Sequence, residues 1–383
     1  MPMPAFEIGR ALGIPIRVHM SWFLVFVFVS WTLATGYLPE ALPGLSGQRY
    51  WGMGAAAALL LFLSVLLHEL GHSYVAQRYH IPIGQITLFI FGGVAHMGKE
   101  PPSPRAEFLI AIAGPVVSLV LGLLCLGGTI VAESVLHLSG TQGFVVLGGL
   151  LGIVNVNLGL FNLIPGFPLD GGRVLRAGLW AWGKNFHRAT GQAATVGFLF
   201  GIVLAGFGAL LVGGAIAGAL DRSLAGNGGW LLFIGAFLSG AAWSARRQVG
   251  LRIVLDTTAV RDVMIRNVVS ISPTLSVQSA VDDFFVAYGF SGFPVTEDDR
   301  IVGIVTADDV QAVPQALWAW KPVRDIMRPS TGALFVPADW SVRLALDRMI
   351  QEGWDRLVVT EDGKPVGLIT RSSVARFLQL RKA

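Results

Sequence analysis

The sequence predicts a multi-pass α-helical membrane domain followed by a soluble α+β domain. Of the 383 residues, 53% are hydrophobic and only 14% are charged, with a mean hydropathy of +0.63. Soluble domains are usually about 25% charged. Residues 1–249 carry 13 Lys/Arg and 8 Asp/Glu, whereas the much shorter stretch 250–383 carries 15 and 16. We therefore predict a membrane domain over 1–249 and a soluble domain over 250–383.

About six helices are predicted to span the membrane. A helix needs about 20 mostly apolar residues to cross a bilayer, and six stretches approach or exceed that length. They are Met20–Tyr37, Trp51–Ala76, Phe108–Ala132, Phe144–Leu163, Ala193–Ala215 and Trp230–Ala245.

Basic residues gather on one side of these spans. Within 1–249, only Arg49 and Arg222 fall in the opposite loops. Because cytoplasmic loops retain Lys and Arg, we expect a multi-pass protein of the cell membrane with both termini and the soluble domain in the cytoplasm. The same rule accounts for the isoelectric point near 9.5. Since no basic run with interleaved aromatic residues occurs, we predict no nucleic-acid partner.

The stretch "LLHELGHSYVAQ" places ionisable groups at the end of the second span. His68 and His72 are four residues apart, so on a helix both rings project from one face and can bind one zinc ion. Glu69 lies beside them, where it can take a proton from a water bound to the metal. An unpaired charge deep in lipid costs about 2.5–3.5 kcal/mol or more, and coordination of a metal offsets that cost.

A catalytic zinc usually has three protein ligands, so a third must come from elsewhere in the chain. Asp170 follows the fourth span in "NLIPGFPLDGGR" and reaches the same side of the membrane as His72. Glu107 is the alternative, but it has the position of a first-turn carboxylate that interacts with a helix dipole. We favour Asp170.

Between the second and third spans, "IGQITLFIFGGVAHMGKEPPSP" is rich in β-branched and aromatic residues. It predicts a short hairpin at the membrane surface, with Gly92 and Gly93 permitting close approach of a backbone. A transmembrane substrate hides its carbonyl groups in helical hydrogen bonds and must unwind before cleavage. The Ile86–Ala95 segment could pair with the unwound stretch by β-addition, or it could be a plain surface hairpin.

"HELGHS", "FGGV", "AGP" (Ala113–Pro115) and "FNLIPGFPLDGGR" (Phe161–Arg173) occur in this order. Together they resemble the site-2 protease family of intramembrane zinc metalloproteases, over residues from about 15 to 245. The resemblance implies one zinc ion on His68, His72 and Asp170, with Glu69 as the catalytic base. It also implies that Asn162 holds the substrate or the developing oxyanion, although an interhelical hydrogen bond is an equal alternative. The substrate would be a membrane protein cleaved in or near a transmembrane segment, as in regulated intramembrane proteolysis.

The soluble domain contains two copies of one pattern. "VRDVM" recurs as "VRDIM", and "FPVTEDDRIVGIVTADDV" as "LVVTEDGKPVGLITRSSV", which places the repeats at about 258–314 and 321–380. These motifs resemble a tandem pair of cystathionine-β-synthase (CBS) domains, as in the site-2 protease subgroup that carries them. That likeness implies Thr306 and Asp309 as contacts for ATP or another adenine nucleotide. The second copy has Ser373 where the aspartate is expected. A ligand-free module that forms a homodimer is an equal alternative.

Two other functions fit parts of the sequence. A transporter or channel with a CBS regulatory tail would explain charges within the membrane, but not a glutamate between two histidines at metal-binding spacing. Transporters also show repeated halves, and residues 1–249 contain no such repeat. A membrane scaffold with a structural zinc is a third alternative, and the water-accessible placement of the site and its three expected ligands argue against it.

Overall fold

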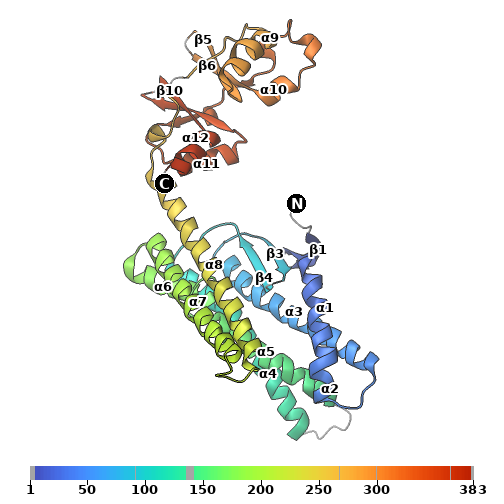
Figure 1. Cartoon of the computed structure of the whole chain (residues 1–383). Helices are drawn as coiled ribbons and strands as arrows, with labels where there is room; N and C mark the ends of the chain where they lie inside the picture. Colours follow the sequence, from blue (N-terminus) through green and yellow to red (C-terminus); the bar gives the residue numbers. More distant parts are fainter. Residues whose placement is uncertain are drawn as a thin grey trace. The chain divides into compact units, whose positions relative to one another are not determined.

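The computed structural model describes residues 5–90, 92–134, 142–266, 268–298, 300–362 and 364–380. The chain divides into two compact units, Met1–Val249 and Gly250–Ala383. Figure 1 shows the first unit as a bundle of long helices with a small sheet, and the second as a mixture of short strands and helices.

Among the described residues, six helical segments are long and apolar enough to span a membrane, which confirms the predicted multi-pass fold. The first segment, Ser21–Ala41, consists of α1 (Ser21–Thr32), a π-helical turn at Leu33–Tyr37 and α2 (Leu38–Ala41). The others are α3 (Gly47–Arg78), α4 (Pro104–Ser134), α5 (Gln142–Asn162), α7 (Phe186–Ile216) and α8 (Leu224–Thr257). Most extend a few residues beyond the predicted bounds, because polar residues continue the helices past their apolar stretches.

Small residues let these helices pack closely. A Cβ atom added at Gly122 of α4 would lie 2.6 Å from Val156 Cγ2 of α5, and one at Gly208 of α7 would lie 2.4 Å from the backbone nitrogen of Leu232 in α8. Large apolar side chains such as Leu123 point outward instead. This arrangement suits lipid, where close van der Waals contact rather than water exclusion holds helices together.

A four-stranded sheet lies beside the helices, in the order β1-β2-β3-β4. Its strands are β1 (Ala5–Ala11), β2 (Ile14–His19), β3 (Ile83–Phe89) and β4 (Gly92–Met97). β3 and β4 form the expected hairpin, and β2 joins β3 in parallel. The sequence analysis missed β1 and β2, although "IPIRVH" alternates buried and half-buried residues as a strand should. β4 is the last strand of the sheet on the side away from β1.

A shorter helix, α6 (Asp170–Gly183), follows the loop after α5 and is not among the membrane spans. Glycine is required where the loop packs against its neighbours. A Cβ atom at Gly171 would lie 2.3 Å from the carbonyl oxygen of Leu163, and one at Gly197 of α7 would lie 2.2 Å from that of Phe167. The loop is therefore held tightly between α6 and α7, and α6 begins at a defined point.

The described residues of the second unit form two three-stranded sheets, in the orders β5-β6-β7 and β10-β9-β8. The strands are β5 (Gly292–Glu297), β6 (Arg300–Thr306), β7 (Arg328–Pro329), β8 (Phe335–Pro337), β9 (Arg356–Glu361) and β10 (Lys364–Thr370). The helices are α9 (Val277–Ala280) with a π-helical turn at Val281–Val286, α10 (Ala307–Gln311), α11 (Val342–Gln351) and α12 (Arg371–Leu380). This mixed architecture confirms the predicted α+β fold.

The two repeats of this unit exchange their first segments. The backbone N–H of Val260, from the first "VRD" motif, donates to the carbonyl oxygen of Trp340 in the second repeat at 2.8 Å. The N–H of Val323, from the second motif, donates to Leu275 in the first repeat, also at 2.8 Å. Each repeat thus completes the other, which explains why two copies occur together.

Candidate metal centre

Two histidines of α3 and one aspartate of α6 converge on a single point. His68 Nε2 and His72 Nε2 each lie 3.1 Å from Asp170 Oδ2, and the two nitrogens are 3.2 Å apart. Both histidines are buried, at 4% and 3% exposure. His72 and Asp170 are 98 positions apart in the sequence. They meet because α3 and α6 both pack against α4.

Hydrogen bonds behind the rings fix their orientation. His72 Nδ1 lies 2.6 Å from the carbonyl oxygen of Ile110, and His68 Nδ1 lies 2.9 Å from Ser118 Oγ, both on α4. A carbonyl oxygen can only accept, so Nδ1 of His72 carries the proton and donates it. In a neutral ring, Nε2 then presents a lone pair toward the convergence point, which is the usual arrangement of a metal-binding histidine.

The three facing atoms fit a zinc ion. Ligand atoms about 2.0–2.1 Å from a tetrahedral zinc lie about 3.3–3.4 Å from one another, close to the separations of 3.1–3.2 Å here. Among the described residues, this is a group of three side chains whose ligand atoms all lie within 4.8 Å of one another. Three electron-rich atoms held so close repel one another unless a cation or proton lies between them.

Gly114 of α4 provides the space for the two rings. A Cβ atom there would lie 2.3 Å from His72 Nε2 and 2.7 Å from His68 Nε2. The next residue, Pro115, lies inside α4, which continues through it to Ser134. The "AGP" motif thus places helix backbone without a side chain, at Gly114, against the Nε2 atoms of both imidazoles.

Asp170 is the first residue of α6 and is almost completely enclosed. Burial alone would raise the pKa of its carboxyl group. When the two histidines carry a proton on Nε2, their hydrogen bonds to Asp170 and their charges outweigh burial and hold that pKa well below its usual range. The carboxylate is therefore ionised at neutral pH and can act as a ligand.

Glu69 lies on the same helix as the two histidines and next to β4. The backbone N–H of Ala95 in β4 interacts with its carboxylate. A Cβ atom at Gly93 would lie 2.5 Å from Glu69 Cγ and 3.3 Å from Oε1. Gly92, the neighbouring glycine, adopts a φ of +122°, a value that side chains rarely allow. The two glycines let the strand pass directly over the glutamate.

Comparison with known proteins agrees with this geometry. The model of peptidase family M50 matches residues 56–140 and 126–206, and the CBS-domain model matches residues 260–314 and 323–380. A Synechocystis protein named "Putative zinc metalloprotease sll0528" is 35% identical over 98% of this chain and 96% of its own length. "Zinc metalloprotease MJ0392" of Methanocaldococcus jannaschii is 30% identical over the same shares of the two chains. The chain belongs to peptidase family M50.

Among solved structures, a site-2 protease from Methanocaldococcus jannaschii covers 64% of this M50 peptidase and 96% of its own chain. It is 32% identical, with a TM-score of 0.42. The two CBS-domain matches identify the repeats of the second unit as a tandem CBS pair.

In this M50 peptidase, Glu107 is not part of the metal centre. It lies in the first turn of α4 and is completely buried. Its Oε1 accepts from Arg173 Nε at 3.1 Å and from Arg176 Nη2, both on α6. The structure therefore brings Asp170, and not Glu107, to the two histidines.

Asn162 is not joined to the centre by a hydrogen bond among the described residues. Its Nδ2 donates to the carbonyl oxygen of Leu158, one turn earlier in α5, at 3.0 Å. The sequence analysis missed Asn155, which is buried on the same helix and donates to Ser64 Oγ of α3 at 3.0 Å. An asparagine within the apolar run "GIVNVNL" was the available signal, since polar groups in spans usually have a partner.

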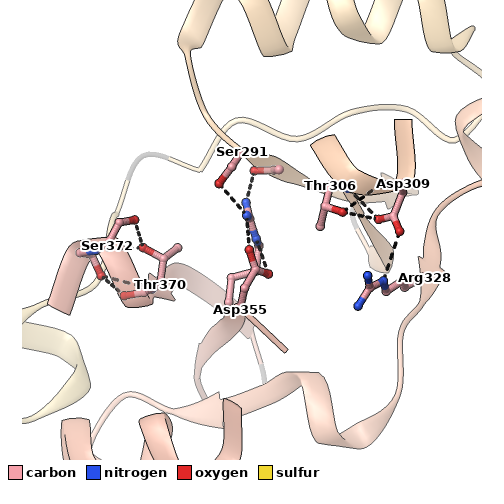
Figure 2. A network of polar contacts seen from close by, with 10 residues as sticks. Ser291, Thr306, Asp309, Arg328, Asp355, Thr370 and Ser372 are labelled. Carbon is pink, nitrogen blue, oxygen red and sulfur yellow. Dashed lines mark hydrogen bonds and ion pairs between the residues drawn. The ribbon is translucent and has the colours of Figure 1, made fainter. Parts of the chain in front are cut away.

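The CBS pair holds Thr306 and Asp309 at the start of α10. Asp309 Oδ2 accepts from Thr306 Oγ1 at 2.6 Å, and Asp309 Oδ1 accepts from Arg328 Nε at 3.2 Å. In the second repeat, Ser373 takes the place of the aspartate, and its N–H donates to Thr370 Oγ1 at 3.0 Å. Figure 2 shows Thr306, Asp309 and Arg328 on one side of the view and Thr370 on the other, with Ser291 and Asp355 between them.

Proposed function

We propose that this M50 peptidase is an intramembrane zinc metalloprotease that hydrolyses peptide bonds in or near the transmembrane segments of membrane proteins. The observation that carries the proposal is the meeting of His68, His72 and Asp170, whose ligand atoms lie within 4.8 Å of one another beside Glu69. His68, His72 and Glu69 lie on α3, which is long and apolar enough to span a membrane. The names of the two full-length relatives support the assignment of zinc.

Each residue of the centre has a separate task. His68, His72 and Asp170 would hold the ion, with Ser118 and the Ile110 carbonyl keeping the rings in place. A bound zinc ion supplies Lewis acidity, which lowers the pKa of water and polarises a carbonyl group. Glu69 takes the proton of the attacking water and passes it to the leaving amine of the cleaved bond. Asn162 is proposed to contact the substrate or the oxyanion, which requires its side chain to leave the Leu158 carbonyl.

The substrate is proposed to bind as an added strand along β4. β4 is the last strand of the sheet, so its outer edge is the place where an extended segment would pair. Gly92 and Gly93 keep this strand close to Glu69. A peptide paired there would run past the catalytic glutamate with its carbonyl groups exposed, which a helical segment cannot offer.

The orientation of the protein is proposed from its loops. All Lys and Arg of residues 1–249 except Arg49 and Arg222 fall on one side of the spans, so both termini and the CBS pair are assigned to the cytoplasm. His68 and His72 lie near the end of α3 that reaches that same side. The β3–β4 hairpin follows this end of α3, and Asp170 follows the end of α5 on that side.

The CBS pair is proposed to sense ATP or another adenine nucleotide through Thr306 and Asp309. Both side chains are already oriented at the start of α10, and Arg328 adds a positive charge beside them. Isothermal titration of the full-length protein with ATP should give one binding event that Asp309→Ala abolishes and Ser373→Ala does not. Equal binding by both variants would contradict this assignment.

The CBS pair is also proposed to form a homodimer. Val286 and Ile350 lie 64 residues apart, at equivalent places in the two repeats, and are 74% and 69% exposed. Two apolar side chains at matching positions suit a symmetric partner. Size-exclusion chromatography with light scattering should give a dimer that V286E/I350E converts to a monomer. An unchanged mass would contradict it.

One assay tests the proposed protease directly. Purified protein is mixed with a membrane-embedded substrate, and the fragments are identified by mass spectrometry. Glu69→Gln should abolish cleavage while the protein still binds one equivalent of zinc, because the glutamate moves protons and does not hold the ion. A transporter has no cleavage to lose. Unchanged cleavage by the variant, or no zinc in either protein, would contradict the proposal.

A further inference from the structure

Three buried charges connect α4 to α6 next to the metal centre, and the proposed reaction uses none of them. The Glu107 side chain is fully enclosed, and those of Arg173 and Arg176 are 15% and 13% exposed. Arg176 also stacks on Phe167 of the loop before α6, with its guanidinium carbon 5.1 Å from the ring centre. Burying charges is costly even when they are paired, so this cluster needs an explanation.

The arginines lie on the same helix as a metal ligand of opposite charge. Arg173 follows Asp170 by three residues, a spacing at which oppositely charged side chains on a helix meet and pair. Among the described residues, however, Asp170 makes its ion pairs with His68 and His72, and Arg173 pairs with Glu107. The natural helical partner of the aspartate is thus engaged elsewhere.

We propose that Glu107 is a positioning residue that holds Arg173 away from Asp170, so that the Asp170 carboxylate remains available to the metal. Both arginines bind the same oxygen, Oε1 of Glu107. Loss of this one carboxylate charge therefore removes the ion-pair partner of Arg173, while Arg176 keeps the charge of Glu100 nearby. The nearest acidic group on the same helix turn is then Asp170. An Asp170–Arg173 pair would place a guanidinium group where the cation must bind.

This mechanism differs from a purely structural role of the cluster. If Glu107 only stabilises the fold, Glu107→Gln protein that remains folded binds zinc with wild-type affinity and a normal Co²⁺ spectrum, because nothing competes for Asp170. If Glu107 sequesters Arg173, the folded single variant binds zinc weakly, and removal of Arg173 as well takes away the competitor and restores binding. The inference rests on the proposed metal centre, and the wild-type protein therefore serves as the test of that centre.

The experiment measures zinc affinity of the full-length protein in detergent by competition with a chromogenic chelator. The Co²⁺-substituted form, followed by its visible absorption, reports the ligand geometry. Glu107→Gln should lower the affinity at least about tenfold, in the range of changes to groups that orient metal ligands, and should alter the Co²⁺ spectrum. The double variant E107Q/R173Q should recover to within about threefold of wild type with a normal spectrum.

The matched control is Glu133→Gln, which removes the same charge from an exposed position near the other end of α4. It should leave affinity and spectrum unchanged. If Glu107→Gln does not fold, the variant E107M/R173M/R176M replaces all three charges by apolar side chains, a type of change that buried ion clusters often tolerate. It should bind zinc like wild type, because no cation is left to compete.

Two results would overturn the inference: wild-type affinity in Glu107→Gln, or affinity in E107Q/R173Q that stays as low as in the single variant. With the triple variant, loss of zinc binding in a folded protein would overturn it as well. Absence of zinc from the wild-type protein would instead refute the proposed metal centre itself.

Discussion

Gly93 of β4 lies against Glu69 of α3 so closely that a Cβ atom at position 93 would be 2.5 Å from Glu69 Cγ. This contact joins the sheet to the helix that carries the histidines, at the residue proposed to move the proton. The backbone of β4 therefore defines one wall of the proposed reaction site, and a Cβ atom at position 93 requires the Glu69 side chain or one of the two elements to shift.

Gly93→Ala should reduce cleavage at least about tenfold, because displacement of a catalytic group by about 1 Å can cost as much as 100-fold. Zinc content should remain at one equivalent, since the three ligands lie on α3 and α6. Initial rates and metal analysis of the same preparation provide the measurement. The control is Gly84→Ala in β3, where the added Cβ would be 3.8 Å from its nearest neighbour, an ordinary contact. A drop in zinc content in parallel with activity would argue against this role of β4.

Gly114→Ala should act on the metal itself. The new methyl group would fall 2.3 Å from His72 Nε2, so one or both rings must move. We expect zinc affinity to fall at least about tenfold, as for changes that misorient metal ligands, with activity lost accordingly. Chelator competition measures the affinity. Gly127→Ala, on the same helix with no atom within 4 Å of its added Cβ, should bind zinc normally. Equal affinities in the two variants would refute the close approach of α4.

Removal of the metal should both inactivate and destabilise the protein. Without a cation, Asp170 Oδ2 and the two Nε2 atoms remain 3.1–3.2 Å apart and repel one another unless a proton intervenes. A ligand that binds only the folded state adds about 2.7 kcal/mol when present at 100 times its dissociation constant. Thermal unfolding in detergent should show a lower midpoint after chelation, restored together with activity by zinc. In Asp170→Asn, zinc should shift the midpoint little, and a wild-type-sized shift would contradict the assignment of this ligand.

The CBS pair should lose some stability in acid because of Asp355. Burial raises the pKa of this carboxyl group, but hydrogen bonds and charge from Arg356 outweigh burial, so the pKa is lowered in the fold. Because the pKa is lower in the folded state, the ionised carboxylate stabilises the fold at pH values above the unfolded pKa, near 3.9. This stability is lost as the pH falls through the folded pKa. The side chain is 51% exposed, which limits the contribution to about 1 kcal/mol or less.

Hydrogen exchange of β5 and β9 in the full-length protein measures this effect, since Arg356 also donates to the carbonyl oxygen of Gly292 at 2.5 Å. Asp355→Asn should exchange faster than wild type at pH 7, and the difference should shrink toward pH 3. A difference that grows as the pH falls would show that the sign is wrong.

Much of the architecture could be predicted from local sequence alone. The six spans follow from apolar length, because a bilayer imposes about 20 residues on any crossing helix. The repeats are visible as recurring motifs. By contrast, β1 and β2 were missed, because β1 is exposed on both faces and shows no apolar alternation, and the pairing of β2 with β3 is long-range.

The sequence by itself determined that His68, His72 and Glu69 lie on one helix, with the two histidines on one face, since the 3.6-residue period sets which side chains share a face. Only the tertiary structure decided between Asp170 and Glu107 as their partner, because both lie in the first turn of a helix and both are expected on the same side of the membrane. Packing of α6 on α4 turned Asp170 toward the histidines and placed Glu107 against Arg173 and Arg176. Such contacts depend on how helices meet in three dimensions, and no local pattern records that.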